Sequence, residues 1–580
     1  MKETGKASLR RSVDIDFLEQ YFSGNGIDIS AGEDGLSAYM QLFPKINSVK
    51  NWDLVDGDAQ FLPGVDDKSY DFVYSSHCLE HMVDPLIAID NWLRVLKPGG
   101  HLIVTVPDED MYEHGVWPSK FNSDHKWSFT LYKPNSGMPK SINLTDLAKN
   151  FFDKAEIRRL AVLNREYKIG NYDDQSLGSA ECSLEFVLQK KLDSNDCLRR
   201  AFEFDIKGET QKALEFYELS IQKNRLNIKG YELLSNLLIR HGNVPDAKKV
   251  LEICRINTPD DRNSHYIYAL LLIALGEFDH GFDLREKYIS GFHPRSHDLP
   301  EPINIQRWHG ESLIGKSIVI WTEFGAGDEI MFSRFVSVFK NQLQAKRVIL
   351  VCREMLVDFL STLIDVDLVV SPKNIDLIGS PNYWIYPHSI PTCFSLEKHG
   401  VPNNIPYLSA NSEKIEYFRA LLPTSGNFKI GFVMQGDPTH ENDNARSIHD
   451  PELMQEIFNI PRIDWISLQK NGLGSSELPL KIHDSSSCTF IGSRLLNYSD
   501  TAAVCSNLDL VISVDTSVAH VCGALGVDTW LILPAYSDWR WGIGDKSPWY
   551  PQMTLFRQKN HFIWDEVMAG IRNALITRLT

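Results

Sequence analysis

The sequence predicts an α/β protein of several domains, in which three Rossmann-like units are joined by a short segment of α-helical repeats. Apolar runs alternate with amphipathic helical stretches between residues 26 and about 190, and this texture returns twice after residue 311. Between about 197 and 290, glycines recur every 34 residues instead. Because strands that alternate with helices form parallel sheets, each alternating block predicts a doubly wound sheet. A chain of 580 residues is also too long for one hydrophobic core.

Composition and charge exclude several classes of protein. The 76 acidic against 59 basic residues give a net charge of -17, which repels a phosphate backbone and argues against nucleic-acid binding. The nine cysteines are scattered without the paired spacing of a zinc site or a disulfide framework. The start lacks the apolar core of a signal peptide, and no apolar run approaches the roughly 20 residues that span a bilayer. We therefore expect a cytoplasmic protein without an integral membrane segment.

The first block, residues 1–192, carries a ligand-binding pattern at the end of its first predicted strand. Asp28 ends an apolar run and is followed by Ser30, Gly32 and Gly35. Ligands of open α/β sheets bind at the carboxyl ends of the strands, and glycine lets the backbone approach a ligand closely. Taken alone, the pattern more often marks a simple turn.

Three further segments follow in a characteristic order: GDAQFLP at 57–63, YDFVYSSHCLEH at 70–81 and LRVLKPGGHLIVTVP at 93–107. With them, residues 20 to 190 resemble the Rossmann-like methyltransferases that depend on S-adenosylmethionine (SAM). The resemblance implies SAM as cofactor, with a binding set of Asp28, Ser30, Gly32, Asp58, Ala59 and Ser75. Within this set, Asp28 and Gly32 line the methionine end, Asp58 and Ala59 neighbour the adenine, and Ser75 faces the reaction centre.

Two departures from the family pattern concern the cofactor loop and the ribose. Ser30 stands at the usual first glycine, and the third glycine is displaced to Gly35. No clear acid ends a second strand to hold the ribose hydroxyls, and Asp53 and Asp56 are poor substitutes. These departures leave open that the domain is degenerate.

Histidines near the reaction centre are candidates for acid-base catalysis. His77 or His81 could remove a proton from an acceptor hydroxyl, because imidazole titrates near neutral pH. Packing or a helix-start role explains each equally well. His114, Asp124 and His125 lie in the next loop without a fixed helical spacing, so we expect a loop over the acceptor and no metal site.

The second block, residues 193–290, predicts paired helices. Gly208, Gly242 and Gly276 are 34 residues apart, and the small residues Ala213, Ala247 and Gly281 keep the same step. This pattern resembles about two and a half tetratricopeptide repeats, which bury their faces by stacking on neighbours. We expect so few repeats to be structural, to mediate self-association or to bind a protein partner.

The third and fourth blocks, residues 291–427 and 428–580, read as two Rossmann-like halves with a cleft between them, entered through a connector at 291–311 that is rich in Pro, His and Gly. Asp328, on a glycine-bearing turn between a strand and a helix, could act as a general base. Asp515 ends a strand, and Thr516 and Ser517 open a helix whose N–H groups could bind phosphate. Asp, Ser and Thr in such places are more often plain helix caps.

These motifs, with SLQK at 467–470 and the aromatic stretch 538–558, resemble heptosyltransferase-related glycosyltransferases of the GT-B fold that carry tetratricopeptide repeats. The resemblance spans about 200 to 575 and implies inverting, metal-independent transfer from a nucleotide sugar. It places Asp328 as the base, and the implied donor site comprises Arg446, Lys470, Asp515, Thr516, Ser517 and His520. Without a metal, cationic groups must stabilise the leaving diphosphate, although Arg446 and Lys470 are equally well explained as surface charges. Trp539 and Trp541 could stack on a sugar, but a packed corner is favoured.

The sequence therefore predicts a bifunctional enzyme that methylates and glycosylates a glycan or glycoconjugate acceptor in surface-polysaccharide synthesis, with peripheral membrane association as an option. Two alternatives remain open. The repeats could form a scaffold beside a single active catalytic domain, or the acceptor could be a protein.

Overall fold

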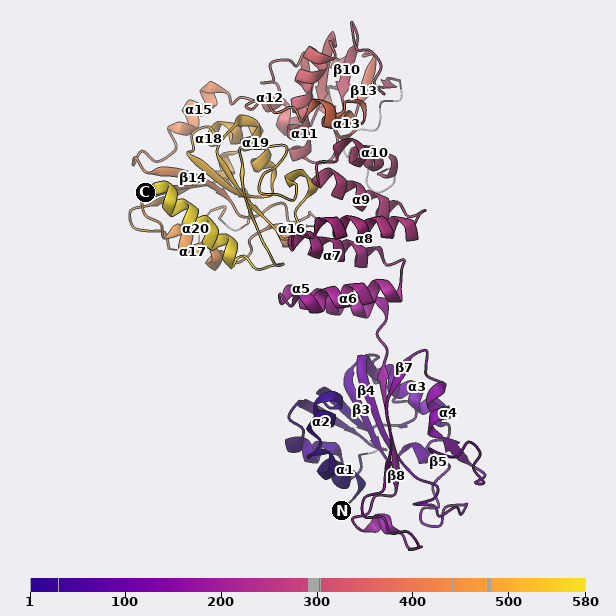
Figure 1. Ribbon diagram of the computed structural model, residues 1–580. Helices are drawn as coiled ribbons and strands as arrows, with labels where there is room; N and C mark the ends of the chain where they lie inside the picture. The colour runs from indigo at the N-terminus through magenta and orange to yellow at the C-terminus, as the bar shows by residue number, and fades with distance from the viewer. Residues whose placement is uncertain are drawn as a thin grey trace. The chain divides into compact units, whose positions relative to one another are not determined.

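The computed structural model describes residues 2–29, 31–289, 302, 304–440, 442–472, 474–476 and 481–580. It divides into two compact units, Met1–Cys197 and Leu198–Thr580, which we describe separately (Figure 1). Ser30 and most of the predicted connector at 291–311 lie outside the described residues. Within the described part, no helix combines the length and the apolar character that a membrane crossing requires.

The first unit is built on a six-stranded sheet in the order β2-β1-β3-β4-β8-β7. Strands β1 to β4 run parallel, and β8 is antiparallel to both of its neighbours. The strands are β1 (Gly24–Ile29), β2 (Ile46–Trp52), β3 (Tyr70–Ser76), β4 (Leu96–Pro107), β7 (Ala155–Leu163) and β8 (Ser183–Lys190). Helices α1 (Glu3–Arg11) and α2 (Ile15–Tyr21) lie on one side, and α3 (Pro85–Val95) and α4 (Leu144–Lys149) on the other (Figure 1). A short pair, β5 (Ser128–Thr130) and β6 (Ser141–Asn143), completes the unit.

Local sequence explains why these elements form and where they begin. The centre of β3 and the second half of β4 are buried on both faces, as expected of continuous apolar runs in a parallel sheet. Helix α3 starts with Pro85 after Asp84, whose side chain accepts from the N–H groups of Leu86 and Ile87. The predicted α/β fold of this block is confirmed.

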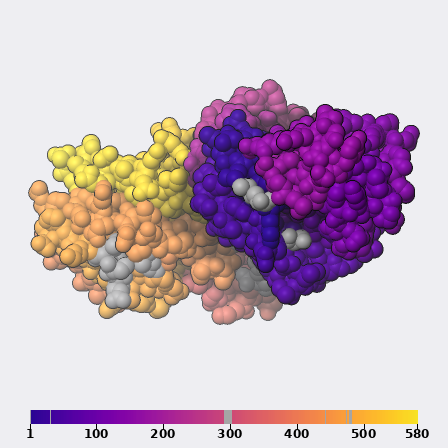
Figure 2. Space-filling model, turned by 90° about the horizontal axis from the view of Figure 1, so that it is seen from below, coloured from indigo at the N-terminus to yellow at the C-terminus, as the bar shows by residue number. Residues whose placement is uncertain are grey.

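The N-terminal helix is fastened to the late strands of the same unit. Arg11 pairs with Glu185 on β8, and both side chains are almost fully buried. The Lys6 ammonium donates to the carbonyl of Ala180 at 3.1 Å. Figure 2 shows the corresponding indigo and magenta surfaces in contact. These contacts bring the start of the chain to the edge of the sheet where β3 ends.

The second unit begins with six helices in three successive pairs, as the 34-residue period predicts; their identity as tetratricopeptide repeats stays a prediction. Gly208, Gly242 and Gly276 follow α5, α7 and α9 with φ of 72°, 78° and 83°, a region that disfavours other residues. Ala213 and Ala247 are fully buried at helix contacts. The helices are α5 (Ser194–Ile206), α6 (Thr210–Lys223), α7 (Ile228–Arg240), α8 (Val244–Asn257), α9 (Arg262–Ala274) and α10 (Phe278–Tyr288).

Two parallel sheets follow the helices. The first has the order β12-β11-β10-β13-β9 and the second β16-β15-β14-β17-β18-β19. The strands of the first are β9 (Gln306–Arg307), β10 (Ser317–Ile320), β11 (Arg347–Val351), β12 (Leu368–Val370) and β13 (Tyr383–Ile385). Those of the second are β14 (Phe428–Val433), β15 (Ile463–Ser467), β16 (Ser487–Phe490), β17 (Leu510–Val514), β18 (Thr529–Leu533) and β19 (Thr554–Arg557). The two predicted Rossmann-like halves are thus present.

Helices cover both sheets of the second unit (Figure 1). Those around the first sheet are α11 (Ala326–Phe332), α12 (Val357–Leu360), α13 (Ile390–Cys393) and α14 (Leu396–His399). Those around the second are α15 (Ser412–Arg419), α16 (Asp443–Arg446), α17 (Gln455–Phe458), α18 (Tyr498–Cys505), α19 (Ser517–Leu525) and α20 (Asp565–Leu579). Each sheet has one point where the strand order reverses. It lies between β10 and β13 in the first sheet and between β14 and β17 in the second. Ligands of open sheets bind outside the strand ends at such switch points.

The last helix pair and both halves contribute to one shared hydrophobic cluster. Phe278 and Phe282 of α10 pack in the same cluster as Trp539 and Trp549 of the second half. The two halves meet where α11 packs against α19. A Cβ atom on Gly327 would lie 2.6 Å from a ring carbon of His520, so only glycine permits this close approach. The division of this unit into three domains stays a prediction.

Candidate functional sites

Of the predicted cofactor residues that the structure describes, Asp28 and Gly32 lie at the carboxyl end of β1 and Ser75 at that of β3. Asp28, near the end of β1, is 1% exposed, and its carboxylate accepts from the N–H of Leu36 at 2.6 Å. Burial raises the pKa of Asp28 to about 7. The carboxylate thus fixes the loop between β1 and residue 36.

Gly32 and Ser75 lie next to Asp28 at the strand ends, and Asp58 and Ala59 lie in the loop after β2. Gly32 has a φ of 50°, and the space beside its Cα is open. Ser75 pairs with Ile29 in the sheet, and its buried hydroxyl has no hydrogen-bond partner among the described residues. In the loop after β2, the side chain of Asp58 accepts from Gln60, and the carbonyl of Ala59 accepts from Trp92. The roles of these residues in SAM binding stay predictions.

Asp53, a poor substitute for the missing ribose acid on the sequence pattern, lies directly at the end of a strand. It directly follows Trp52, the last residue of β2, which pairs with Ile29 at the end of β1. An acid at this point can accept hydrogen bonds from ribose hydroxyls. The signal was weak because β2 is an edge strand with four exposed residues, so no apolar run marks its end.

His77 and His81 follow β3 and have different surroundings. His77 has a φ of 53°; its Nε2 lies 3.0 Å from the Ser183 hydroxyl and its Nδ1 3.4 Å from the Glu80 carboxylate. Burial disfavours the charged form of the His77 ring. The Glu80 carboxylate favours that form more strongly, so the pKa of His77 is raised. The His81 ring is partly exposed, and its Nδ1 lies 3.0 Å from Asp124.

In the second unit, Asp328 lies on the first turn of α11, directly after the loop that follows β10. One carboxylate oxygen accepts from the Arg540 guanidinium (Nε at 3.0 Å) and lies 3.0 Å from His388 Nε2. The other accepts from the N–H of Gly325 at 3.1 Å. Burial alone would raise the pKa of Asp328, but Arg540 and His388 hold it well below its usual range.

Behind Asp328 lies a buried pair that the sequence did not reveal. His388 Nδ1 and the backbone N–H of His388 both lie 2.9 Å from a carboxylate oxygen of Glu323, and both side chains are fully buried. Glu323 follows β10 and His388 follows β13, the two strands at the switch point. The one sequence signal that points to these two residues is that each follows closely after a predicted strand.

The second sheet also presents charged groups at its switch point. Arg446 packs against Gly436, which follows β14, and its Nε has no hydrogen-bond partner among the described residues. Asp443 lies 3.6 Å from the same nitrogen. Asp515 follows β17; burial and then Asp538 raise its pKa to about 6, while Arg446 opposes the rise. A largely buried guanidinium can bind an anion.

The remaining predicted donor residues are spread more widely. Thr516 is the N-cap of α19, yet its side chain accepts no hydrogen bond from the helix, so it does not cap in the usual way. Ser517 accepts from the Tyr498 hydroxyl at 2.8 Å. His520 is 4% exposed at the contact between α11 and α19, and burial lowers its pKa to about 3. Lys470 is exposed in the loop after β15.

The aromatic stretch forms a packed corner, as favoured from the sequence. Trp541 is fully buried and Trp539 is 7% exposed. Between them, Arg540 lies over the Trp539 ring, pairs with Asp538 at 2.6 Å, and reaches across to Asp328. The corner positions a cation at the junction of the two halves.

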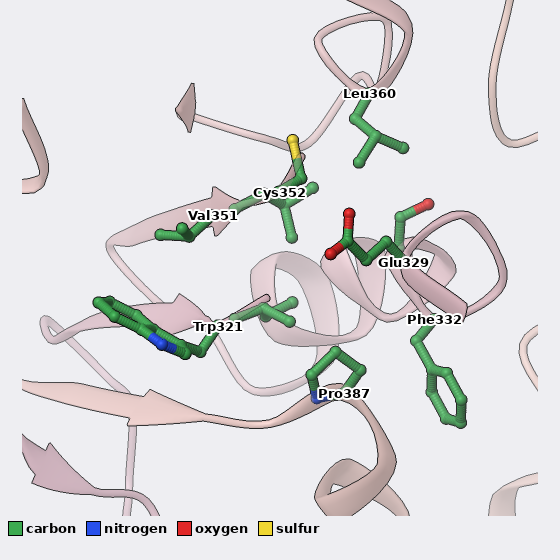
Figure 3. Close-up of a pocket in the computed structure, with 10 residues that line it drawn as sticks. Trp321, Glu329, Phe332, Val351, Cys352, Leu360 and Pro387 are labelled. Carbon is green, nitrogen blue, oxygen red and sulfur yellow. The ribbon is translucent and has the colours of Figure 1, made fainter. Parts of the chain in front are cut away.

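A small cavity beside α11 is part of the core of the first half. Its walls are mostly apolar, and Figure 3 shows the Glu329 carboxylate pointing toward the side of Val351 and Cys352. Glu329 accepts from Thr322 and from the backbone and side chain of Arg353. Burial raises the pKa of Glu329 to about 7. The cavity has room for about one water molecule and is too small for a sugar.

Comparisons with known proteins give the following similarities. Residues 19–104 match the family described as a methyltransferase domain. Protein FlbA of Caulobacter vibrioides is 24% identical over 330 residues, which cover 53% of this chain and 54% of that protein, so the match spans about half the length of the relative. A glycosyl transferase family 9 structure from Veillonella parvula covers 45% of this chain and 92% of that chain at 12% identity, with a TM-score of 0.33. The E. coli ADP-heptose lps heptosyltransferase II covers 46% of this chain and 100% of that chain at 11% identity, with a TM-score of 0.31.

Proposed function

We propose that the chain is a bifunctional enzyme that transfers a methyl group from SAM in its first unit and a sugar from a nucleotide-sugar donor in its second unit. The methyltransferase match over residues 19–104 carries the first half of the proposal. The meeting of charged residues from two parallel sheets at one junction supports the second half. The acceptor is a glycan or glycoconjugate.

In the first unit, the edge formed by β1, β2 and β3 is the proposed SAM site. Asp28 holds the loop after β1 through Leu36, which leaves the open side of Gly32 for the cofactor. Asp53 would accept from the ribose hydroxyls. His77 lies beyond the end of β3, where an acceptor hydroxyl could lose its proton.

In the second unit, Asp328 is the proposed general base and Arg446 a proposed partner of the donor diphosphate. Asp328 is ionised at neutral pH, but its low pKa makes it a weak base while Arg540 is paired with it. We infer that substrate binding draws Arg540 away, toward a phosphate group, which raises the basicity of Asp328. The fixed His388–Glu323 pair would keep the carboxylate oriented during this exchange.

Turnover assays test both halves. The first measures transfer of a labelled methyl group from SAM to a glycan acceptor, and the second measures nucleoside diphosphate release from a panel of nucleotide sugars. Asp328→Asn should lower glycosyl transfer by about 10²- to 10⁴-fold and leave methyl transfer unchanged. Nucleotide release that is unaffected by this change would remove Asp328 as the base. Turnover of one kind only would favour a scaffold with a single active domain.

A further inference from the structure

Three side chains of the first unit form a compact group of nitrogen and oxygen donors. Glu80 and His81 lie in the short 3-10 helix Leu79–His81 after β3, and His125 lies in the loop before β5. One potential ligand atom from each lies within 4.8 Å of the other two. Among the described residues, this is the one group of three or more such side chains with that geometry.

The histidine rings are held in the way that metal-bound histidines usually are. His125 Nδ1 lies 2.7 Å from the Glu113 carboxylate, and both side chains are almost fully buried. His81 Nδ1 lies 3.0 Å from the Asp124 carboxylate. A ring that donates its Nδ1–H to a carboxylate keeps the lone pair of Nε2 for a metal ion. The two rings also face each other edge to face, with centroids 5.0 Å apart.

The carboxylate of the group lacks the partners that a buried charge needs. Glu80 is fully buried, and neither of its carboxylate oxygens has a hydrogen-bond partner among the described residues. The neighbouring His77 approaches one oxygen only at 3.4 Å. The second oxygen of Glu113 is likewise buried without a hydrogen-bond partner. A buried carboxylate whose oxygens lack hydrogen-bond donors is costly, and a bound cation would offset that cost.

We propose that Glu80, His81 and His125 bind a divalent first-row transition metal ion, with Glu113 and Asp124 orienting the two rings. Two imidazoles and one carboxylate are a donor set that binds Zn²⁺, Fe²⁺ or Mn²⁺ and leaves coordination positions open. His81 is the partly exposed member, so the open positions face the side from which an acceptor can enter.

The role of the ion rests on the proposed methyl transfer, whereas its binding does not. A metal ion beside the end of β3 would coordinate the acceptor hydroxyl and favour loss of its proton, as a Lewis acid does. The proton would pass to water on the side where His81 is partly exposed. This proposal departs from the expectation, drawn from the sequence, of no metal site in the loop that holds His125. The spacing of the ligands does not reveal the group, because they come from two segments more than 40 residues apart.

Metal binding is tested on the full-length, tag-free protein after treatment with a chelator. Titration with Zn²⁺, Mn²⁺ or Co²⁺ by calorimetry should give one ion per chain, and bound Co²⁺ should show visible absorption bands. Glu80→Gln and His125→Gln should weaken binding by at least about 100-fold, and Glu113→Gln by about 10- to 100-fold. His241→Gln, which changes an exposed histidine of the second unit, should bind as the unaltered chain does.

The outcomes separate this proposal from the proposed function. Binding that is absent, or equal in the Glu80→Gln variant and the unaltered chain, overturns the metal site. If Glu80→Gln does not fold, the Co²⁺ spectrum and the Glu113→Gln variant decide. The unaltered chain and the metal-free Glu80→Gln variant should bind S-adenosylhomocysteine equally well. If the unaltered chain does not bind S-adenosylhomocysteine, that result counts against the methyltransferase proposal alone.

Discussion

The ion pair between Asp328 and Arg540 should contribute strongly to the stability of the second unit. The side chains are only 11% and 16% exposed, and they join residues 212 positions apart. Removing one member of a buried pair costs about 3–5 kcal/mol when the other is left alone. Here each keeps a second partner, since Arg540 pairs with Asp538 and Asp328 lies 3.0 Å from His388. We therefore expect Asp328→Asn and Arg540→Met each to cost about 2–3 kcal/mol.

A double-mutant cycle measures the pair itself. The two single variants and the double variant are unfolded in urea, with fluorescence of the buried tryptophans near the pair as the signal. We expect a coupling energy of about 2 kcal/mol, because the double variant removes both charges together. An exposed pair, Glu416 with Arg419, provides the control through Glu416→Gln and Arg419→Met. Its coupling should stay near about 0.3–0.5 kcal/mol. A buried pair no stronger than this control would refute the reasoning.

Three further predictions follow from single side chains. Asp28→Ala should weaken binding of S-adenosylhomocysteine in calorimetry, because the loop that contains Leu36 loses its anchor. Nucleotide binding should persist, and an equal loss of both would indicate misfolding. Gly327→Ala should destabilise the second unit by about 1–3 kcal/mol in urea unfolding, since the added methyl meets His520; unchanged stability would show that α11 and α19 can separate freely. Burial raises the pKa of Glu329 to about 7, so the folded state binds its proton more tightly than the unfolded state, and this group's stabilisation falls as pH rises from about 4.5 to about 7. Glu329→Gln should therefore gain stability relative to the unaltered chain across that range, by up to about 3 kcal/mol, and a difference independent of pH would contradict the shift.

Much of the fold could be predicted because it follows from local periodicity. Buried strands such as β3 and β17 are continuous apolar runs, and the glycines at 208, 242 and 276 mark turns that need a positive φ. Strand β2 was harder to recognise, since an edge strand needs few apolar residues. The sequence therefore does not mark Asp53 as a residue at a strand end.

The sites could be predicted only where they follow strand ends. Asp28 and Asp515 stand directly at such ends, and the structure places them there. The partners of Asp328 could not be predicted, because His388 and Arg540 reach it through the packing of distant segments. No local pattern encodes such contacts, and the same holds for Glu80 and His125.

The central claim, two ligand classes bound by two units of one chain, is tested most directly by thermal unfolding of the full chain with S-adenosylhomocysteine or with single nucleoside diphosphates and nucleotide sugars. A ligand at about 100 times its Kd stabilises the state that binds it by about 2.7 kcal/mol, or about 5–10 °C for the first unit. We expect both classes to raise a melting temperature, Asp28→Ala to remove the first shift alone, and Arg446→Gln to remove the second alone. A chain that responds to neither class would contradict the two-site claim.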